Sequence, residues 1–245
     1  MTTQVLPTDA IPAARSGGEP ARLGHYRAFT RAVLAKCEGD PGARSALRSG
    51  VRKDLDSVPR MHRVIAHLVP HNVSEDTQRA YYAVAAMIAE QARRQGDATG
   101  ADETTAAPEA AQVAEAAQAA VAAGEAERER EYGLSLGTAF ALAVVRSPGH
   151  ERKMRRGTAE SRLNLLCKQG LTGLHRHLPA SVRYLRSLDV PVDWARLLQD
   201  LVDWRRHSGR ITRHWLQDFY RRLQQEERRL REQADAAQPP ADTDA

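Results

Sequence analysis

The chain of 245 residues is long enough for one large domain or two small ones, and its 36 lysines and arginines against 31 aspartates and glutamates give a formal net charge of +5. Two isolated cysteines, Cys37 and Cys167, argue against a disulfide framework or a Cys/His metal site and favour a reducing, cytoplasmic location. We see no signal-peptide pattern and no run of about 18 apolar residues, so neither secretion nor a membrane contact is expected.

The small net charge hides a strong segregation along the chain. Residues 97–131 hold nine acids and two arginines, and residues 232–245 hold four acids and no base. Residues 146–186 hold ten bases and two acids. Such clustering is typical of a protein with a polyanionic partner, although arginines that only decorate solvated helix faces would give a similar pattern.

The first part of the chain predicts helices. Residues 1–21 are rich in proline and glycine and predict a disordered lead, and residues 22–96 predict an N-terminal helical subdomain. Its best-specified helix follows Ser74, which is expected to cap it, with two acids in the first turn. Residues 97–131, rich in alanine and glutamate, predict an acidic insertion with little to bury.

Residues 132–231 predict a basic C-terminal helical subdomain, and residues 232–245 predict a disordered tail. We expect Thr158 to cap a helix with Leu163, Leu166 and also Leu165 inward, and Pro179 to end the element after it. A helical hairpin should follow, capped at its start by Asp193 and broken at residues 208–209. No segment alternates as a strand would, so the predicted fold is an all-α helical bundle.

One motif suggests an enzyme, because residues 133–137 read G-x-S-x-G. In α/β-hydrolases this motif places the serine on a strand-to-helix turn above a parallel sheet. The strand and helix alternation of such a sheet is missing here, so we interpret the motif as a loop-to-helix junction whose small residues permit close packing. On this interpretation, Ser135→Ala abolishes no esterase activity.

No other pattern supports catalysis or a bound cofactor. His175 and His177 are two residues apart, which places them on different sides of a helix and makes a poor metal pair. P-loop, HExxH and glycine-rich nucleotide motifs are missing from the sequence. We therefore predict no catalytic residue, no metal and no cofactor.

The remaining pattern in the sequence is the number of basic residues. Arginine grips phosphate through a planar set of donors and stays charged at all relevant pH values. Most aromatic residues fall on apolar helix faces, which predicts phosphate contacts with weak sequence preference. The candidate nucleic-acid-binding residues are Arg27, Arg48, Lys53, Arg152, Lys153, Arg155, Arg156, Arg162, Lys168, Arg183, Arg186, Arg205, Arg206 and Arg210.

Several landmarks in order resemble a known family, the small subunit (CasB) of the type I-E CRISPR surveillance complex Cascade. The resemblance covers roughly residues 22–225 without the insertion. The landmarks are His25-Tyr26-Arg27-Ala28-Phe29, Val58-Pro59 with Arg63 and Leu68-Val69, Leu134-Ser135-Leu136-Gly137, Glu160 to Leu166, Val192-Asp193-Trp194 with Asp203-Trp204, and Leu216-Gln217-Asp218-Phe219.

The resemblance implies a non-catalytic, all-helical subunit of an antiviral ribonucleoprotein. Its implied partners are other Cascade subunits, a second copy of itself, CRISPR RNA and target DNA, chiefly the displaced strand. Arg27 matches an early Tyr-Arg of the family, for which a subunit contact is the alternative role. Positions that match the family's strand-binding groove are Arg48, Arg162, Lys168 and Arg183, and by proximity Arg205, Arg206 and Arg210.

Two alternatives remain at this point. The arginines of a helical protein–protein adaptor could meet acidic protein surfaces with no nucleic acid involved. A sequence-specific repressor is disfavoured, because no compact helix-turn-helix with base-reading residues is visible.

Overall fold

The computed structural model describes residues 19–91, 133–145 and 153–236, and all regular secondary structure within these ranges is helical. The prediction of an all-α fold is confirmed for this part of the chain. The helices are α1 (Glu19–Gly39), α2 (Pro41–Arg48), α3 (Pro59–Ile65), α4 (Glu75–Glu90), α6 (Leu136–Val145), α7 (Arg156–Cys167), α8 (Leu171–Ser187) and α9 (Trp194–Ala236), with 3-10 turns η1 (Leu55–Ser57) and η2 (Ala66–Leu68).

Two predicted boundaries are corrected by these helices. Helix α1 begins at Glu19, inside the predicted lead, because Pro20 is well tolerated in the first turn of a helix. Helix α9 continues to Ala236, five residues into the predicted tail. The rest of the lead and tail and the predicted insertion at residues 97–131 lie outside the described residues, and the division into two subdomains stays a prediction.

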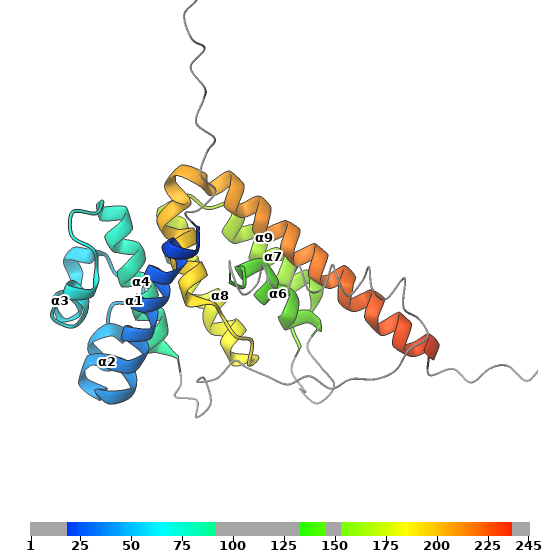
Figure 1. Ribbon diagram of the computed structural model, residues 1–245, viewed down its shortest axis with the longest axis horizontal. Helices are drawn as coiled ribbons and strands as arrows, with labels where there is room; N and C mark the ends of the chain where they lie inside the picture. The colour runs from blue at the N-terminus through cyan, green and yellow to red at the C-terminus, as the bar shows by residue number, and fades with distance from the viewer. Residues whose placement is uncertain (1–18, 92–132, 146–152, 237–245) are drawn as a thin grey trace, which may run out of the picture.

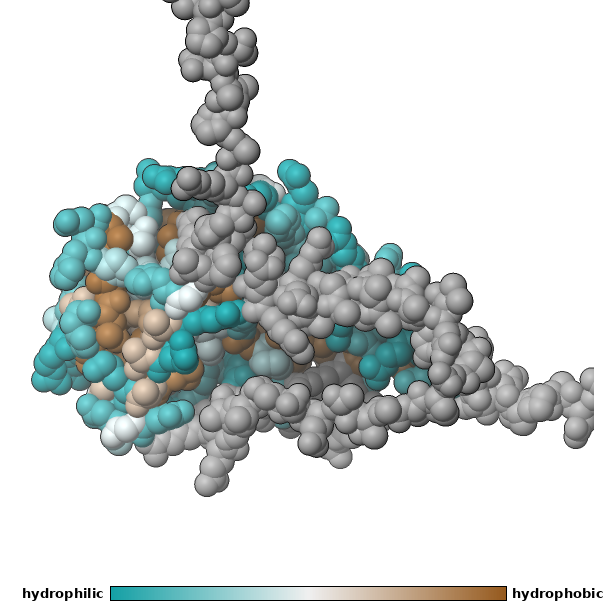
Figure 2. All heavy atoms as spheres, viewed as in Figure 1, coloured by the Kyte–Doolittle hydropathy of each residue, from teal (hydrophilic) through white to brown (hydrophobic). Residues whose placement is uncertain are grey.

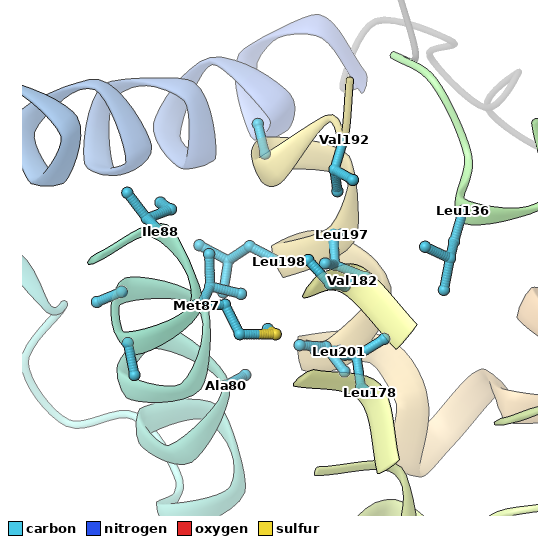
Figure 3. Packing of buried hydrophobic residues seen from close by; sticks show 14 of the residues in the cluster. Ala80, Met87, Ile88, Leu136, Leu178, Val182, Val192, Leu197, Leu198 and Leu201 are labelled. Carbon is cyan, nitrogen blue, oxygen red and sulfur yellow. The ribbon is translucent and has the colours of Figure 1, made fainter. Parts of the chain in front are cut away.

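Helices α4, α8 and α9 meet at the centre of the fold. Figure 1 shows α1 to α4 gathered at one end of the molecule and α6, α7 and the second half of α9 at the other. Figure 3 shows Met87 of α4 and Val182 of α8 converging with Leu198 and Leu201 of α9. Since the buried apolar residues form one continuous cluster, the two ends share a single core. None of the helices in the described ranges is long and apolar enough to cross a bilayer.

Helix α4 begins where the sequence predicts. Ser74 Oγ accepts a hydrogen bond from the backbone N–H of Thr77 at 3.3 Å, and Glu75 and Asp76 occupy the first turn. The helix is buried almost all round, because α1, α2, α8 and α9 all contact it. Its alanines allow this close approach, while Tyr81 packs edge-on against Phe29 of α1 with ring centroids 4.7 Å apart.

The predicted helical hairpin is confirmed within α9. Asp193 caps its start by accepting the N–H of Arg196 at 2.9 Å. At His207 the backbone leaves helical geometry (φ −132°, ψ 21°), one residue before the predicted break. Across this kink, the Trp204 and Trp215 rings lie 5.1 Å apart and Trp215 Nε1 donates to Asp200 at 2.7 Å. A straight helix would hold residues 200 and 215 about 22 Å apart, so the two halves fold back on each other.

Three local predictions are wrong. Thr158 does not cap α7, because the helix already starts at Arg156 and its N-cap position is Arg155. Pro179 does not end α8, which continues through it to Ser187; burial of Val182 and Leu185 beyond the proline outweighs the missing backbone donor. Leu165 faces outward with 44% of its surface exposed.

The G-x-S-x-G segment runs from a loop into the first residues of α6, as the loop-to-helix interpretation expects. Ser135 Oγ accepts the N–H of Thr138 at 3.2 Å and so caps this helix. Gly137 lies against the backbone of Trp215, where an added Cβ would overlap the Trp215 carbonyl. No strand in the described residues adjoins the motif, so the nucleophile-elbow geometry is missing and the serine serves the helix start.

Candidate nucleic-acid interface

Ion pairs mark both ends of helix α4. Arg205 of α9 pairs with Asp76 in the first turn of α4. Arg183 of α8 pairs with Glu90 in its last turn. Since Asp76 and Glu90 are separated by about 21 Å along the helix axis, the two arginines stand at opposite ends of α4.

More bases lie between these ends. Arg52, Lys53, Arg79 and Arg176 line a cavity bounded by the α2–η1 loop, α3, α4 and α8. Arg79 pairs with Asp54, whereas the exposed Arg52, Lys53 and Arg176 have no carboxylate within ion-pair distance in the described part of the chain. Within the described residues, these three side chains can therefore pair with an external anion without first giving up an ion pair.

We call this row the α4–α8 stripe. It holds six bases, Arg52, Lys53, Arg79, Arg176, Arg183 and Arg205, against three carboxylates, Asp54, Asp76 and Glu90. A row of positive charge about 21 Å long can follow several phosphates of a single strand. In Figure 2, hydrophobic residues also reach the surface between hydrophilic ones over α1 to α4. The surface at this end of the molecule is therefore partly polar and partly apolar.

One aromatic contact extends the Arg183 end of the stripe. The guanidinium carbon of Arg162 on α7 lies 4.6 Å from the centre of the Tyr184 ring on α8. Both residues are half-buried. A partly accessible aromatic side chain thus does lie among the bases, which the sequence analysis did not expect.

The other candidate residues lie at several separate places in the structure. Arg156 pairs with Glu160 and with Glu227 of α9, at 3.1 and 2.9 Å, and so faces the second half of α9. Lys168 lies near the Arg205 end, because the carbonyl of the next residue, Gln169, accepts Trp204 Nε1 at 3.3 Å. Arg186 reaches the carbonyl of Val190 at 3.5 Å. The others are half-buried Arg27, and exposed Arg48, Lys153, Arg155, Arg206 and Arg210, while Arg152 lies outside the described residues.

Of the fourteen candidates, the stripe thus contains Lys53, Arg183 and Arg205, with Arg162 and Lys168 nearby. Sequence reasoning missed Arg52, Arg79 and Arg176. The seven-residue spacing of Arg176 and Arg183, two helical turns, could have indicated that both lie on one face of α8. For Arg52 and Arg79 we find no comparable sequence signal.

His175 is the buried titratable group beside the stripe. Burial, followed by the nearby charge of Arg79, lowers the pKa of its imidazole to about 4, and the opposing effect of Asp76 is smaller. The ring is therefore neutral near pH 7, and neither ring nitrogen has a hydrogen-bond partner within the described structure. As for metals, the residues that the structure describes contain no group of three His, Cys, Asp or Glu suited to an ion.

Residues 43–220 of the chain match the family described as CRISPR-associated protein Cse2. The chain belongs to the Cse2 family.

No curated protein sequence matches it. Two solved chains described as "CRISPR RNA-guided surveillance complex", one of them in a pre-nicking state, are 32% identical to it at a TM-score of 0.62. The match covers 85% of this chain and 99% and 98% of theirs. The crystal structure of M. ruber CasB, 21% identical over 83% of this chain and 96% of that one, has the same fold at a TM-score of 0.57.

Family membership confirms the resemblance found in the sequence, that of the type I-E Cascade small subunit. Cse2 proteins are non-catalytic subunits, which agrees with the prediction that this chain is not an enzyme. Its function therefore depends on binding surfaces and not on a reaction centre.

Proposed function

We propose that this Cse2 protein is a subunit of a CRISPR RNA-guided surveillance complex, in the cytoplasm, and binds the displaced non-target DNA strand through the α4–α8 stripe. By holding that strand it stabilises the R-loop during antiviral defence. The observation that carries the proposal is the row of six bases along α4, three of which have no carboxylate partner among the described residues.

The energetics of strand exchange suit such a stripe. Forming an RNA–DNA hybrid in place of a DNA duplex is close to balanced, so a few protein contacts to the released strand are enough to shift the equilibrium. Contacts through phosphate also tolerate any sequence, which a protein serving many targets requires.

The proposed partners are the other subunits of the complex, a second copy of this chain, CRISPR RNA and target DNA. The resemblance to a chain of such a complex over 99% of that chain's length supports this assignment. Large apolar side chains also lie exposed on α7 and α9, namely Leu165, Tyr220 and Leu230, and they offer apolar contacts for a protein neighbour.

Reversing charge in the stripe tests the proposal in the assembled complex. We expect Arg176→Glu with Arg183→Glu to shorten the R-loop lifetime by about tenfold or more, because two attractive contacts become repulsive ones. The lifetime is measured from dissociation of labelled target DNA, and thermal melting of the subunit shows that it still folds.

The matched control is Arg221→Glu with Arg228→Glu, the same change of charge on exposed residues of the second half of α9. This control should leave the lifetime near the wild-type value. An unchanged lifetime in the stripe variant would remove the stripe from the strand-binding site. If the chain purified from its host with proteins alone and without CRISPR RNA, the adaptor function would be favoured instead.

A further inference from the structure

The cavity inside the α4–α8 stripe has a volume of about 290 Å³, which approaches the size of sites for small organic ligands. Its rim is basic, with exposed Arg52, Lys53 and Arg176. Its interior is mainly apolar, with Met61, Met87 and Pro179 buried in its walls. The cavity thus joins a surface for an anion to a recess for an uncharged group.

A buried histidine adds hydrogen-bonding groups to this recess. His175 lines the cavity with only 8% of its surface exposed, and both ring nitrogens lack a hydrogen-bond partner in the described structure. A neutral imidazole offers one donor and one acceptor. Leaving both without a partner is costly, so a ligand group or a water that supplies the complementary acceptor and donor would be stabilised there.

The combination favours one class of ligand. A phosphodiester group alone carries acceptors only and would leave the acceptor nitrogen of His175 and the apolar walls unused. A nucleobase has a flat, apolar face together with donors and acceptors along its edge. In a nucleotide, the sugar links the base to the phosphate and holds the two apart. Tyr82 is among the residues that line the same cavity, and aromatic residues are the kind on which bases stack.

We propose that the α2–α4–α8 cavity binds one nucleotide of a single strand, with the base inside the cavity and the phosphate against the basic rim. The site rests on the proposed function, since the strand would follow the stripe and turn one base inward at its middle. Free nucleotides share the same chemistry, and the experiment below separates them from a strand.

The test measures affinity of the full chain for an oligothymidylate of about 20 nucleotides, the length displaced in an R-loop, and for the same strand without bases. We expect loss of the bases to weaken binding to the wild-type chain by about tenfold, the effect of one stacked base. In Ala83→Met, whose longer side chain fills the cavity, both strands should bind with the same affinity.

Ala35→Met, the same substitution on the exposed face of α1, is the matched control and should keep the wild-type preference for the strand with bases. Thr172→Leu, at an exposed position that also lines the cavity, gives a second filled variant in case Ala83→Met melts at a lower temperature. Equal affinity of the wild-type chain for both strands, or an undiminished preference in the filled variants, would overturn the nucleotide site while leaving phosphate binding by the stripe intact.

If neither strand binds the wild-type chain, the proposed function fails. Titration with dAMP then tests whether the cavity binds a free nucleotide. Saturable binding of dAMP to the wild-type chain that is lost in Ala83→Met would support a site for free nucleotides. No binding of dAMP, or equal binding by both chains, would overturn the proposal.

Discussion

Asp200 and His175 are two buried side chains whose pKa values are shifted in opposite directions by burial. Complete burial raises the pKa of Asp200 to about 6, against the opposing effects of the Arg196 charge and of hydrogen bonds from Trp215 and Arg196; nearby Asp203 adds a smaller upward effect. Burial lowers the pKa of His175 to about 4. Between these values both groups are largely uncharged in the folded protein.

The two groups act on stability in opposite directions over the same pH range. For Asp200, the folded pKa lies above the unfolded one, so its stabilising contribution is present below pH 3.8 and is lost as pH rises through about 6. For His175, the folded pKa lies below its ordinary value of 6.5, so its contribution is present above that value and is lost as pH falls to about 4. In the wild-type chain the two effects offset each other.

Two neutral substitutions should separate them. The free energy of unfolding of wild type relative to Asp200→Asn should fall by about 2 to 3 kcal/mol between about pH 4 and pH 7, and relative to His175→Gln it should rise by about as much. Urea denaturation at several pH values gives both differences. Because the two variants are expected to have slopes of opposite sign, each serves as the other's control, and slopes of the same sign would contradict the assignment.

At the scale of elements, the contact of α6 with α9 depends on the absence of a side chain at Gly137. This glycine lets the start of α6 lie directly on the backbone of Trp215, just beyond the kink that folds α9 back on itself. The atoms that it meets belong to the backbone of Trp215 in α9 and cannot turn aside as a flexible side chain would.

Adding one methyl group at this contact should force the two helices apart. We expect Gly137→Ala to lower the free energy of unfolding by about 1 to 3 kcal/mol, the usual cost of overpacking a rigid interior. Gly24→Ala in α1, where an added Cβ has no neighbour within 4 Å, should instead raise it by about 0.5 to 1 kcal/mol. Thermal or urea denaturation compares them, and equal effects would show that Gly137 is not a packing constraint.

For the whole molecule, the arrangement of charge matters more than its total. A net charge of +5 over 245 residues is small, yet the fold gathers six bases from the α2–η1 loop, α4, α8 and α9 onto one stripe. Three of these bases already neutralise a carboxylate of the chain itself. The stripe should therefore bind a single strand weakly when the chain is alone, and with a strong dependence on salt.

Salt dependence measures how many phosphates the stripe neutralises. Binding of single-stranded DNA to the isolated chain should weaken with a log–log slope between about −2 and about −4. The first value applies if only the three bases without a carboxylate partner among the described residues contribute, and the second if all six do. Arg52→Gln with Lys53→Gln should make the slope shallower by about 1.4. Fluorescence anisotropy at a series of salt concentrations gives the slope, and an affinity independent of salt would contradict phosphate binding.

The sequence by itself determined the helical elements and several of their ends. Apolar periodicity placed α1, α4 and both halves of α9, and the caps at Ser74 and Asp193 were predictable because each side chain bonds a backbone N–H only three residues away. Ordered landmarks along the chain also indicated the family. These signals depend only on residues close together in the chain, so they can be recognised without knowledge of the fold.

Only the tertiary structure decided what distant residues do together. Packing beyond Pro179 carried α8 past a residue that ends most helices, which no local rule could predict. The pairs that frame the stripe join Arg183 to Glu90 across 93 positions and Arg205 to Asp76 across 129. The cavity likewise draws its walls from the α2–η1 loop, α3, α4 and α8. A helix shows in its sequence which face is basic, but the partner of each charge depends on which helix packs beside it.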